Sequence, residues 1–221
     1  MNTDTPAGTA KLVGGRLCLD FANSAGGRIF DENADHASVG TDYTITNDKI
    51  KNYVDLVVWG RHAGLLSDKE AQRLARLAKA DPAPAKAVYR RGLRLREAIF
   101  RIVGAAIDGL KPDDDDVAEL NHELATANRH ERLLPAADQF TWAWVDADKA
   151  LDRVLWPVVK SAAEILTSDD LSRVRRCGGE NCGWLFLDTS RNRSRHWCDM
   201  KDCGNLAKVR RFRERQREEN S

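Results

Sequence analysis

Four cysteines lie close together near the C-terminal end of this 221-residue chain, and they constrain its fold more than any other feature. Cys177 and Cys182 form one pair, Cys198 and Cys203 form a second pair with the same spacing, and 15 residues separate the pairs. A Zn²⁺ ion takes four soft ligands at the corners of a tetrahedron, and two close cysteine pairs joined by a longer loop supply them. Because the protein fills every coordination position, such an ion stabilises a fold and does not bind substrate. The pattern therefore predicts one structural Zn²⁺ held by the four thiolates.

Two other interpretations of the four cysteines remain open. Four thiolates also bind an iron–sulfur cluster, and four reduced cysteines can be buried without any metal. A segment of about 40 residues rarely folds by apolar burial alone, however, and this favours a metal. His196 is a fifth possible ligand, although it suits the surface of a hairpin equally well. Cys18 stands apart in an apolar run and is expected to be a buried thiol rather than a nucleophile.

The residues around the cysteines predict a hairpin followed by a helix. The first strand is expected at residues 184–187, which are rich in apolar side chains, and the second strand near Arg195. A helix is expected from Gly204 to Arg217. Knuckle, hairpin and helix in this order are typical of a treble-clef finger. The apolar residues of the helix share one face, which we expect to pack on the finger: Leu206, Val209 and Phe212.

Charge is distributed unevenly between the two parts of the chain. Residues 171–221 hold 13 Lys and Arg against 7 Asp and Glu, whereas residues 1–170 hold 22 against 27. A basic tail on an acidic body indicates a nucleic-acid partner, because Lys and Arg contact phosphates and Arg also reads guanine edges. A solvated basic helix without a partner and a protein-binding adaptor finger are the alternatives. The predicted DNA contacts surround the cysteines: Arg175, Arg176, Arg191, Asn192, Arg193, Arg195, Lys208, Arg210, Arg211 and Arg215.

The rest of the chain predicts an α+β, mostly helical N-terminal domain over residues 12–170, followed by the finger over residues 171–221. Residues 1–11 are expected to be disordered, because they carry little that can be buried. The alternation of Leu17, Leu19 and Phe21 predicts a short strand, and residues 31–46 predict a loop. Residues 132–135 and 139–145 predict a strand pair.

Helix start and stop residues place five helices in the N-terminal domain. Ser67 and Glu70 have the spacing of a capping box, and Pro112 precedes four aspartates that suit a helix N-terminus. The last helix is expected to kink at Pro157. The expected helices run from Asn47 or Asp48 to Ala63, from Ser67 to Ala80, from Pro82 to Asp108, from Pro112 to Asn128 and from Asp148 to Leu166.

The N-terminal domain offers candidates for a small-molecule effector site but none for catalysis. Asp20, Asn23 and Arg28 lie beyond the first expected strand, beside a Gly-rich turn, and polar groups in such a place can line a pocket. Capping or packing is the alternative role for each of them. Further candidates are His62 and three tryptophans that are more often core residues, Trp59, Trp142 and Trp144. No nucleophile is paired with a base in the sequence, so we expect that the protein is not an enzyme.

The sequence also indicates where the protein is located and how it assembles. No apolar run approaches the roughly 20 residues that cross a bilayer, and the N-terminus lacks the apolar core of a signal peptide. A cytoplasmic location and no membrane partner are therefore expected. One short finger offers a small DNA interface, and this favours a homodimer that supplies additional affinity.

The finger resembles the CGNR zinc-finger family. The resemblance rests on Arg175 to Cys177, on Cys182 to Asn192, on Trp197 and Cys198, and on Cys203 to Asn205. The motif that gives the family its name ends in Arg, whereas this chain has Leu206 at that position. The preceding part, with residues 17–23 and 59–66, resembles the ABATE domain that precedes this finger.

The resemblance covers the whole chain and carries its own expectations. It implies a bacterial, stress-related transcription regulator with a treble-clef finger that binds DNA. It also implies an α+β N-terminal domain that binds an unidentified ligand. The Arg-to-Leu difference at position 206 leaves the four ligands unaffected and removes any contact that an arginine there would make.

Overall fold

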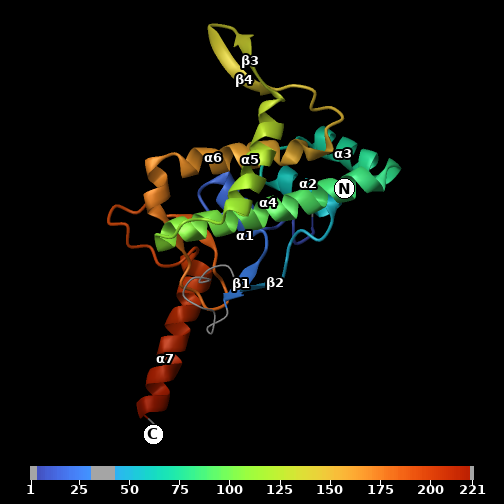
Figure 1. Cartoon of the computed structure of the whole chain (residues 1–221). Coiled ribbons are helices and arrows are strands. Elements are labelled where there is room, and N and C mark those ends of the chain that lie inside the picture. The colour runs from blue at the N-terminus through green and yellow to red at the C-terminus, as the bar shows by residue number, and fades with distance from the viewer. Residues whose placement is uncertain (1–3, 31–42, 220–221) are drawn as a thin grey trace.

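The computed structural model describes residues 4–30 and 43–219, and α-helices dominate it (Figure 1). About 55% of the chain is helical, and the described strands form three two-stranded antiparallel sheets. The predicted α+β, mostly helical fold is confirmed. The long helix α4 (Pro82–Asp108) is the centre of the body, and five helices pack on it: α1 (Leu17–Asn23), α2 (Tyr53–His62), α3 (Asp68–Ala80), α5 (Asp114–Asn128) and α6 (Trp156–Leu166).

The helix boundaries follow from local capping. Ser67 and Glu70 form the predicted capping box at the start of α3. The carboxylate of Asp81 accepts a hydrogen bond from Ala83 N (3.3 Å) and caps α4, which ends at the left-handed Gly109. Asp113 caps α5 in the same way, through Asp115 N (2.8 Å). These helices were predictable because each boundary is set by a few neighbouring residues.

Several predicted elements are wrong. Residues 17–21 belong to helix α1 and not to a strand, because Cys18, Leu19, Phe21 and Ala22 are all buried, a spacing that suits one helical face. Helix α2 begins at Tyr53 and not near residue 47. Asn52 caps it, while the left-handed backbone of Asn47 (φ 56°) is incompatible with a helix.

The predicted kinked helix at residues 148–166 is a short 3₁₀ turn, Leu151–Val154, followed by α6. Pro157 lies in the first turn of α6, where its missing N–H costs nothing, and so it starts the helix instead of bending it. The predicted disorder of residues 1–11 is also wrong for those that the structure describes. Ala7 and Ala10 are buried in the core, and a ring nitrogen of His62 lies 2.7 Å from Ala10 O.

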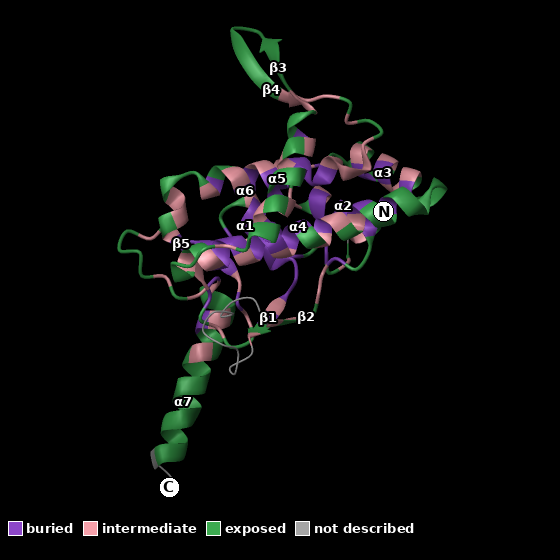
Figure 2. Cartoon of the chain, in the orientation of Figure 1, coloured by how far each residue is buried: buried purple, intermediate pink, exposed green. Residues whose placement is uncertain are grey.

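Two hairpins leave the body on different sides (Figure 1). Strands β1 (Gly27–Phe30) and β2 (Tyr43–Thr46) pair with Gly27 opposite Thr46. The loop predicted at residues 31–46 therefore ends in a strand, and residues 31–42 lie outside the described part. Strands β3 (Glu131–Ala136) and β4 (Gln139–Trp144) form the predicted strand pair, which is exposed over most of its length (Figure 2).

The cysteine segment contains strand β5 (Val174–Arg176), strand β6 (Leu185–Leu187), a π-helical turn at Met200–Gly204 and helix α7 (Asn205–Glu219). Strand β6 pairs with β5, which precedes the first cysteine, so the strand predicted near Arg195 is wrong. Helix α7 extends away from the body as a rod (Figure 1). Its apolar residues are largely exposed and do not pack on the finger as predicted. Leu206, Val209 and Phe212 are 70%, 47% and 58% exposed.

Candidate metal centre and nucleic-acid interface

The four predicted ligands come together in one cluster. The Sγ atoms of Cys177, Cys182, Cys198 and Cys203 all lie within 4.8 Å of one another. Cys198 Sγ is 3.7 Å from Cys182 Sγ and 3.7 Å from Cys203 Sγ. A tetrahedral ion with metal–sulfur bonds of about 2.3 Å separates its sulfurs by about 3.8 Å, whereas a disulfide needs about 2.0 Å. The four free thiols therefore fit the donor set of one tetrahedral metal ion.

The backbone lies close to the sulfur atoms and donates hydrogen bonds to one of them. Cys177 Sγ accepts hydrogen bonds from Gly179 N (3.4 Å) and Cys198 N (3.3 Å), which stabilise negative charge on the sulfur. A Cβ atom on Gly179 would lie only 2.9 Å from Cys203 Sγ. Residue 179 must therefore be glycine for the knuckle to close on the cluster.

Hydrogen bonds among the four thiols shift their pKa values in opposite directions. Hydrogen bonds from Cys182 and Cys198 lower the pKa of the Cys177 thiol. Hydrogen bonding with Cys177 raises the pKa of Cys182 and Cys198, and burial raises that of Cys203. A divalent cation bound here would take the place of the thiol protons.

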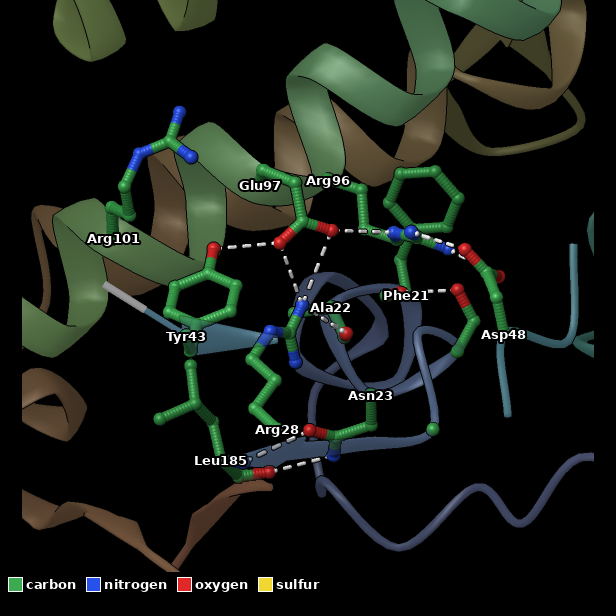
Figure 3. A network of polar contacts seen from close by, with 12 residues as sticks. Phe21, Ala22, Asn23, Arg28, Tyr43, Asp48, Arg96, Glu97, Arg101 and Leu185 are labelled. Atoms are coloured by element: carbon green, nitrogen blue, oxygen red, sulfur yellow. Dashed lines mark hydrogen bonds and ion pairs between the residues drawn. The ribbon is translucent and has the colours of Figure 1, made fainter. Parts of the chain in front are cut away.

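The finger is joined to the body through the free edge of β6. The side chain of Asn23, at the end of α1, donates to Leu185 O (2.8 Å) and accepts from Leu185 N (2.9 Å), as Figure 3 shows. Leu187 N donates to Gly14 O (2.8 Å). Arg28 N donates to Cys182 O (3.1 Å), so β1 contacts the residue that carries one of the four sulfurs. Body and finger therefore share one hydrogen-bonded junction.

A buried charge network lies beside this junction (Figure 3). The guanidinium of Arg28 is fully buried, lies 3.7 Å from the centre of the Phe100 ring, and donates to Glu97 Oε2 (3.1 Å) and Ala22 O (3.0 Å). Arg96 pairs with Asp48 through two hydrogen bonds (2.9 and 2.7 Å) and with Glu97 through a third (2.8 Å).

The charges in this network compensate one another. Burial alone would raise the pKa of Glu97, but Arg28 and Arg96 hold it below its ordinary value. Burial lowers the pKa of Arg28, against the attraction of Glu97. The network ties α4 to β1 and thus supports the strand that contacts the finger.

The three residues predicted for an effector site all make internal contacts. Asn23 and Arg28 hold the junction described above. Asp20 accepts a hydrogen bond from Gly14 N (2.7 Å), and burial raises its pKa from 3.8 to about 6. The sequence alone did not indicate these contacts, because their partners lie up to 162 residues away in the chain.

The other candidates for an effector site, one histidine and three tryptophans, differ in how far they are buried. Trp59 is buried beside Phe21, and Trp144 is half-buried beside Trp156. Trp142, by contrast, is 66% exposed on the β3–β4 hairpin. His62 contacts the N-terminal segment.

A groove that the sequence did not indicate opens between α2, α3 and α4. Its volume is about 650 Å³, and three alanines leave the space where larger side chains would fill it. Ala78 and Ala85 are buried at its base, while three lysines from different elements stand on its sides: Lys51, Lys79 and Lys86.

The basic residues predicted to bind DNA fall into two groups. Three are engaged within the protein. Arg175 donates to Ser172 O (2.9 Å), Arg176 pairs with Asp108 (3.0 Å), and Arg195 lies over the Phe186 ring and donates to Trp197 O (2.8 Å). The others are exposed: Arg191, Asn192, Arg193, Lys208, Arg210, Arg211 and Arg215.

The exposed group occupies one turn and one helix. Asp188 holds the turn by accepting hydrogen bonds from Ser190 N (2.8 Å) and Arg195 N (3.0 Å). On α7, Arg210 pairs with Glu180 and Glu214. Among the described residues, no carboxylate forms an ion pair with Lys208, Arg211 or Arg215. The turn and the protruding helix therefore both present exposed cations to an anionic partner.

Comparisons with known families match nearly the whole chain. The profile of the ABATE family, described as "putative stress-induced transcription regulator", matches residues 15–169. The profile of the CGNR zinc finger matches residues 173–216 and includes all four clustered cysteines. A search of the curated proteins finds no match. No helix in the described ranges is long and apolar enough to cross a membrane.

Proposed function

The chain belongs to the ABATE family of putative stress-induced transcription regulators, and from that premise we propose that it binds DNA through its C-terminal CGNR zinc finger. The observation that carries this proposal is the row of exposed cations that Lys208, Arg211 and Arg215 form on α7. This helix begins two residues after Cys203 and stands clear of the body (Figure 1). A rod of this kind can reach a nucleic acid without interference from the acidic body.

The metal in this proposal is one structural zinc ion per chain. Sulfur separations of 3.7 Å suit four thiolates on a single ion. An iron–sulfur cubane binds each thiolate to a different iron and would need wider separations. Metal analysis should find about one zinc per chain, and a brown protein containing iron would contradict the assignment. When bound, the ion replaces the thiol protons and fixes the start of α7 relative to the knuckle.

The DNA contacts in this proposal come from two places. Arg191 and Arg193 lie in the turn that Asp188 holds, together with Asn192. Lys208, Arg211 and Arg215 lie on α7. Leu206, which stands where the family motif has Arg, is 70% exposed and offers no charge there. Arg175, Arg176 and Arg195 shape the finger through their internal contacts and leave DNA contact to the exposed group.

Salt dependence of DNA binding tests this proposal. Five contacts with phosphates would give log K a slope of about −4.5 against log salt, because each neutralised phosphate releases about 0.9 counterion. Replacing Lys208, Arg211 and Arg215 by Gln should make this slope shallower by the amount that roughly three phosphate contacts contribute. The matched control replaces three exposed cations of the body, Lys69, Arg76 and Arg90, and should leave the slope unchanged. A slope near zero for the natural chain would instead support a protein-binding adaptor.

We also propose that the body binds a small effector in the groove between α2, α3 and α4. Its apolar base and its three lysines suit a compact apolar acid, because the carboxylate would meet ammonium groups at the sides. Benzoate or octanoate should raise the melting temperature of the natural chain. If Ala78→Trp abolishes this rise, the result supports the site. We propose no catalysed reaction. The four clustered cysteines are assigned as metal ligands and not as nucleophiles. A DNA-binding regulator of this family would act in the cytoplasm.

A further inference from the structure

The β3–β4 hairpin stands away from the body (Figure 1), and most of its residues are exposed (Figure 2). Leu133, Phe140 and Trp142 are 51%, 64% and 66% exposed. An isolated two-stranded hairpin is marginally stable in water, and it usually needs a further strand or a packed face. The exposed side chains of this hairpin therefore require an explanation.

The strand register places these side chains on one face. Leu133 lies opposite Trp142, and Pro135 lies opposite Phe140. Because alternate residues of a strand point to the same side, these four residues share one face, which we call the hairpin face. Thr141, between Phe140 and Trp142, points to the other side.

The base of the hairpin is fixed to the body. Trp144 lies 5.6 Å from the Trp156 ring, between ring centres, and Glu131 accepts a hydrogen bond from Lys160 Nζ (2.9 Å). The hairpin is thus held in position, and its apolar face is presented to solvent in a defined direction.

We propose that the hairpin face packs against the same face of a second copy of this chain and forms a homodimer. Its four residues are uncharged, and Glu131, at the base of the same face, is paired with Lys160, so two copies can approach without repulsion between unpaired like charges. A two-fold axis brings each face against its own copy, which is the commonest symmetry of soluble oligomers. At the opposite end of the molecule, the basic surface of α7 would repel a second copy.

The available area fits a reversible dimer. Two aromatic side chains and a leucine at these exposures offer roughly 400 Å² of apolar surface per copy. Two copies would bury about 800 Å² from these groups, and surrounding polar atoms bring the total near the 1,000 Å² or so that a specific interface needs. We therefore expect association in the micromolar range of protein concentration and not a permanent dimer.

The test is sedimentation equilibrium of the full, metal-loaded chain, whose monomer mass is 24.7 kDa. The natural chain should approach twice this mass at high micromolar concentration. Trp142→Lys should weaken association at least 10-fold, because it brings two like charges into the interface. The matched control is Thr141→Lys, which adds the same charge to the same strand on the other face and should dimerise as the natural chain does. Because residue 142 is exposed, the variant should fold, which circular dichroism checks.

Each alternative outcome overturns the proposal. A natural chain that stays monomeric throughout would show that something other than a second copy covers the hairpin face. A Trp142→Lys variant that still dimerises would place the interface elsewhere. Equal loss of dimer in both variants would show that charge on the hairpin, and not the apolar face, determines association. None of these measurements involves DNA, so the proposal stands or falls separately from DNA binding.

Discussion

Replacing Asn23 by Ala should separate the finger from the body more effectively than any other single change at the junction. The side-chain amide of Asn23 is 1% exposed and satisfies both polar backbone groups of Leu185, which is itself fully buried. Pairing with β5 does not involve these two groups, because the neighbouring hydrogen bond runs from Cys177 N to Trp184 O. Asn23 thus occupies the place of an adjacent strand along the edge of β6.

The expected loss follows from the two groups that the substitution leaves without partners. A buried backbone donor or acceptor without a partner costs about 1–3 kcal/mol, so the two together cost about 2–6 kcal/mol. Domains of this size have free energies of unfolding of about 5–15 kcal/mol, and the change is therefore a large fraction of the total. Water that enters the junction would bring the cost to the lower end of the range.

Ser24→Ala is the matched control. Ser24 is the next residue and is 2% exposed, and its hydroxyl donates to Phe21 O (2.6 Å). That oxygen keeps the hydrogen bond from Ser24 N (3.1 Å), so the control should lose only about 1 kcal/mol.

Urea unfolding of the metal-loaded chain, followed by tryptophan fluorescence, measures both variants. Asn23→Ala should also release its metal to a chelator faster than Ser24→Ala does, since the finger loses its attachment. Equal losses of stability in the two variants would refute the reasoning that Asn23 completes the edge of β6.

Three further changes test other parts of the structure. Cys198→Ser should reduce bound metal well below one equivalent and lower the melting temperature of the whole chain, because β6 belongs to the core of the body; full metal content by elemental analysis would contradict this. Glu97→Ala should cost about 3–5 kcal/mol in urea unfolding, because it leaves Arg28 buried without its carboxylate, whereas Glu119→Ala, whose partner is exposed, should cost less than about 1 kcal/mol. The raised pKa of Asp20, about 6, means that its protonated form favours the folded state, so its contribution to stability is fully present below pH 3.8 and is lost as pH rises through 6. Asp20→Asn should therefore raise the melting temperature at about pH 7 more than at about pH 4.5, and a difference that does not vary with pH would contradict this.

Local patterns in the sequence were sufficient for the parts of the molecule that depend on local chemistry. The spacing of the four cysteines predicted a cluster that the structure brings within 4.8 Å. Ser67 and Glu70 marked the start of α3, because a capping box involves residues three positions apart.

Contacts between distant parts of the chain were not predictable in this way. Seven apolar-rich residues at 17–23 are too few to distinguish a strand from a buried helix by periodicity. The apolar face of α7 was evident, but whether anything covers it depends on where the helix points. Asn23 and Arg28 were singled out as polar residues near a turn, yet their partners are brought together only by the complete fold.

The hairpin face and α7 lie at opposite ends of the molecule (Figure 1), and this separation limits how a dimer could engage a chromosome. In a dimer joined at the hairpins, two bodies, each roughly 35 Å across, would lie between the two α7 helices. The distance between these helices would therefore be about 70 Å. Adjacent half-sites on one face of a duplex are only about 34 Å apart. Such a dimer is better suited to bridging two DNA segments than to clamping a single palindrome, and its operators would then carry no inverted repeat at one-turn spacing.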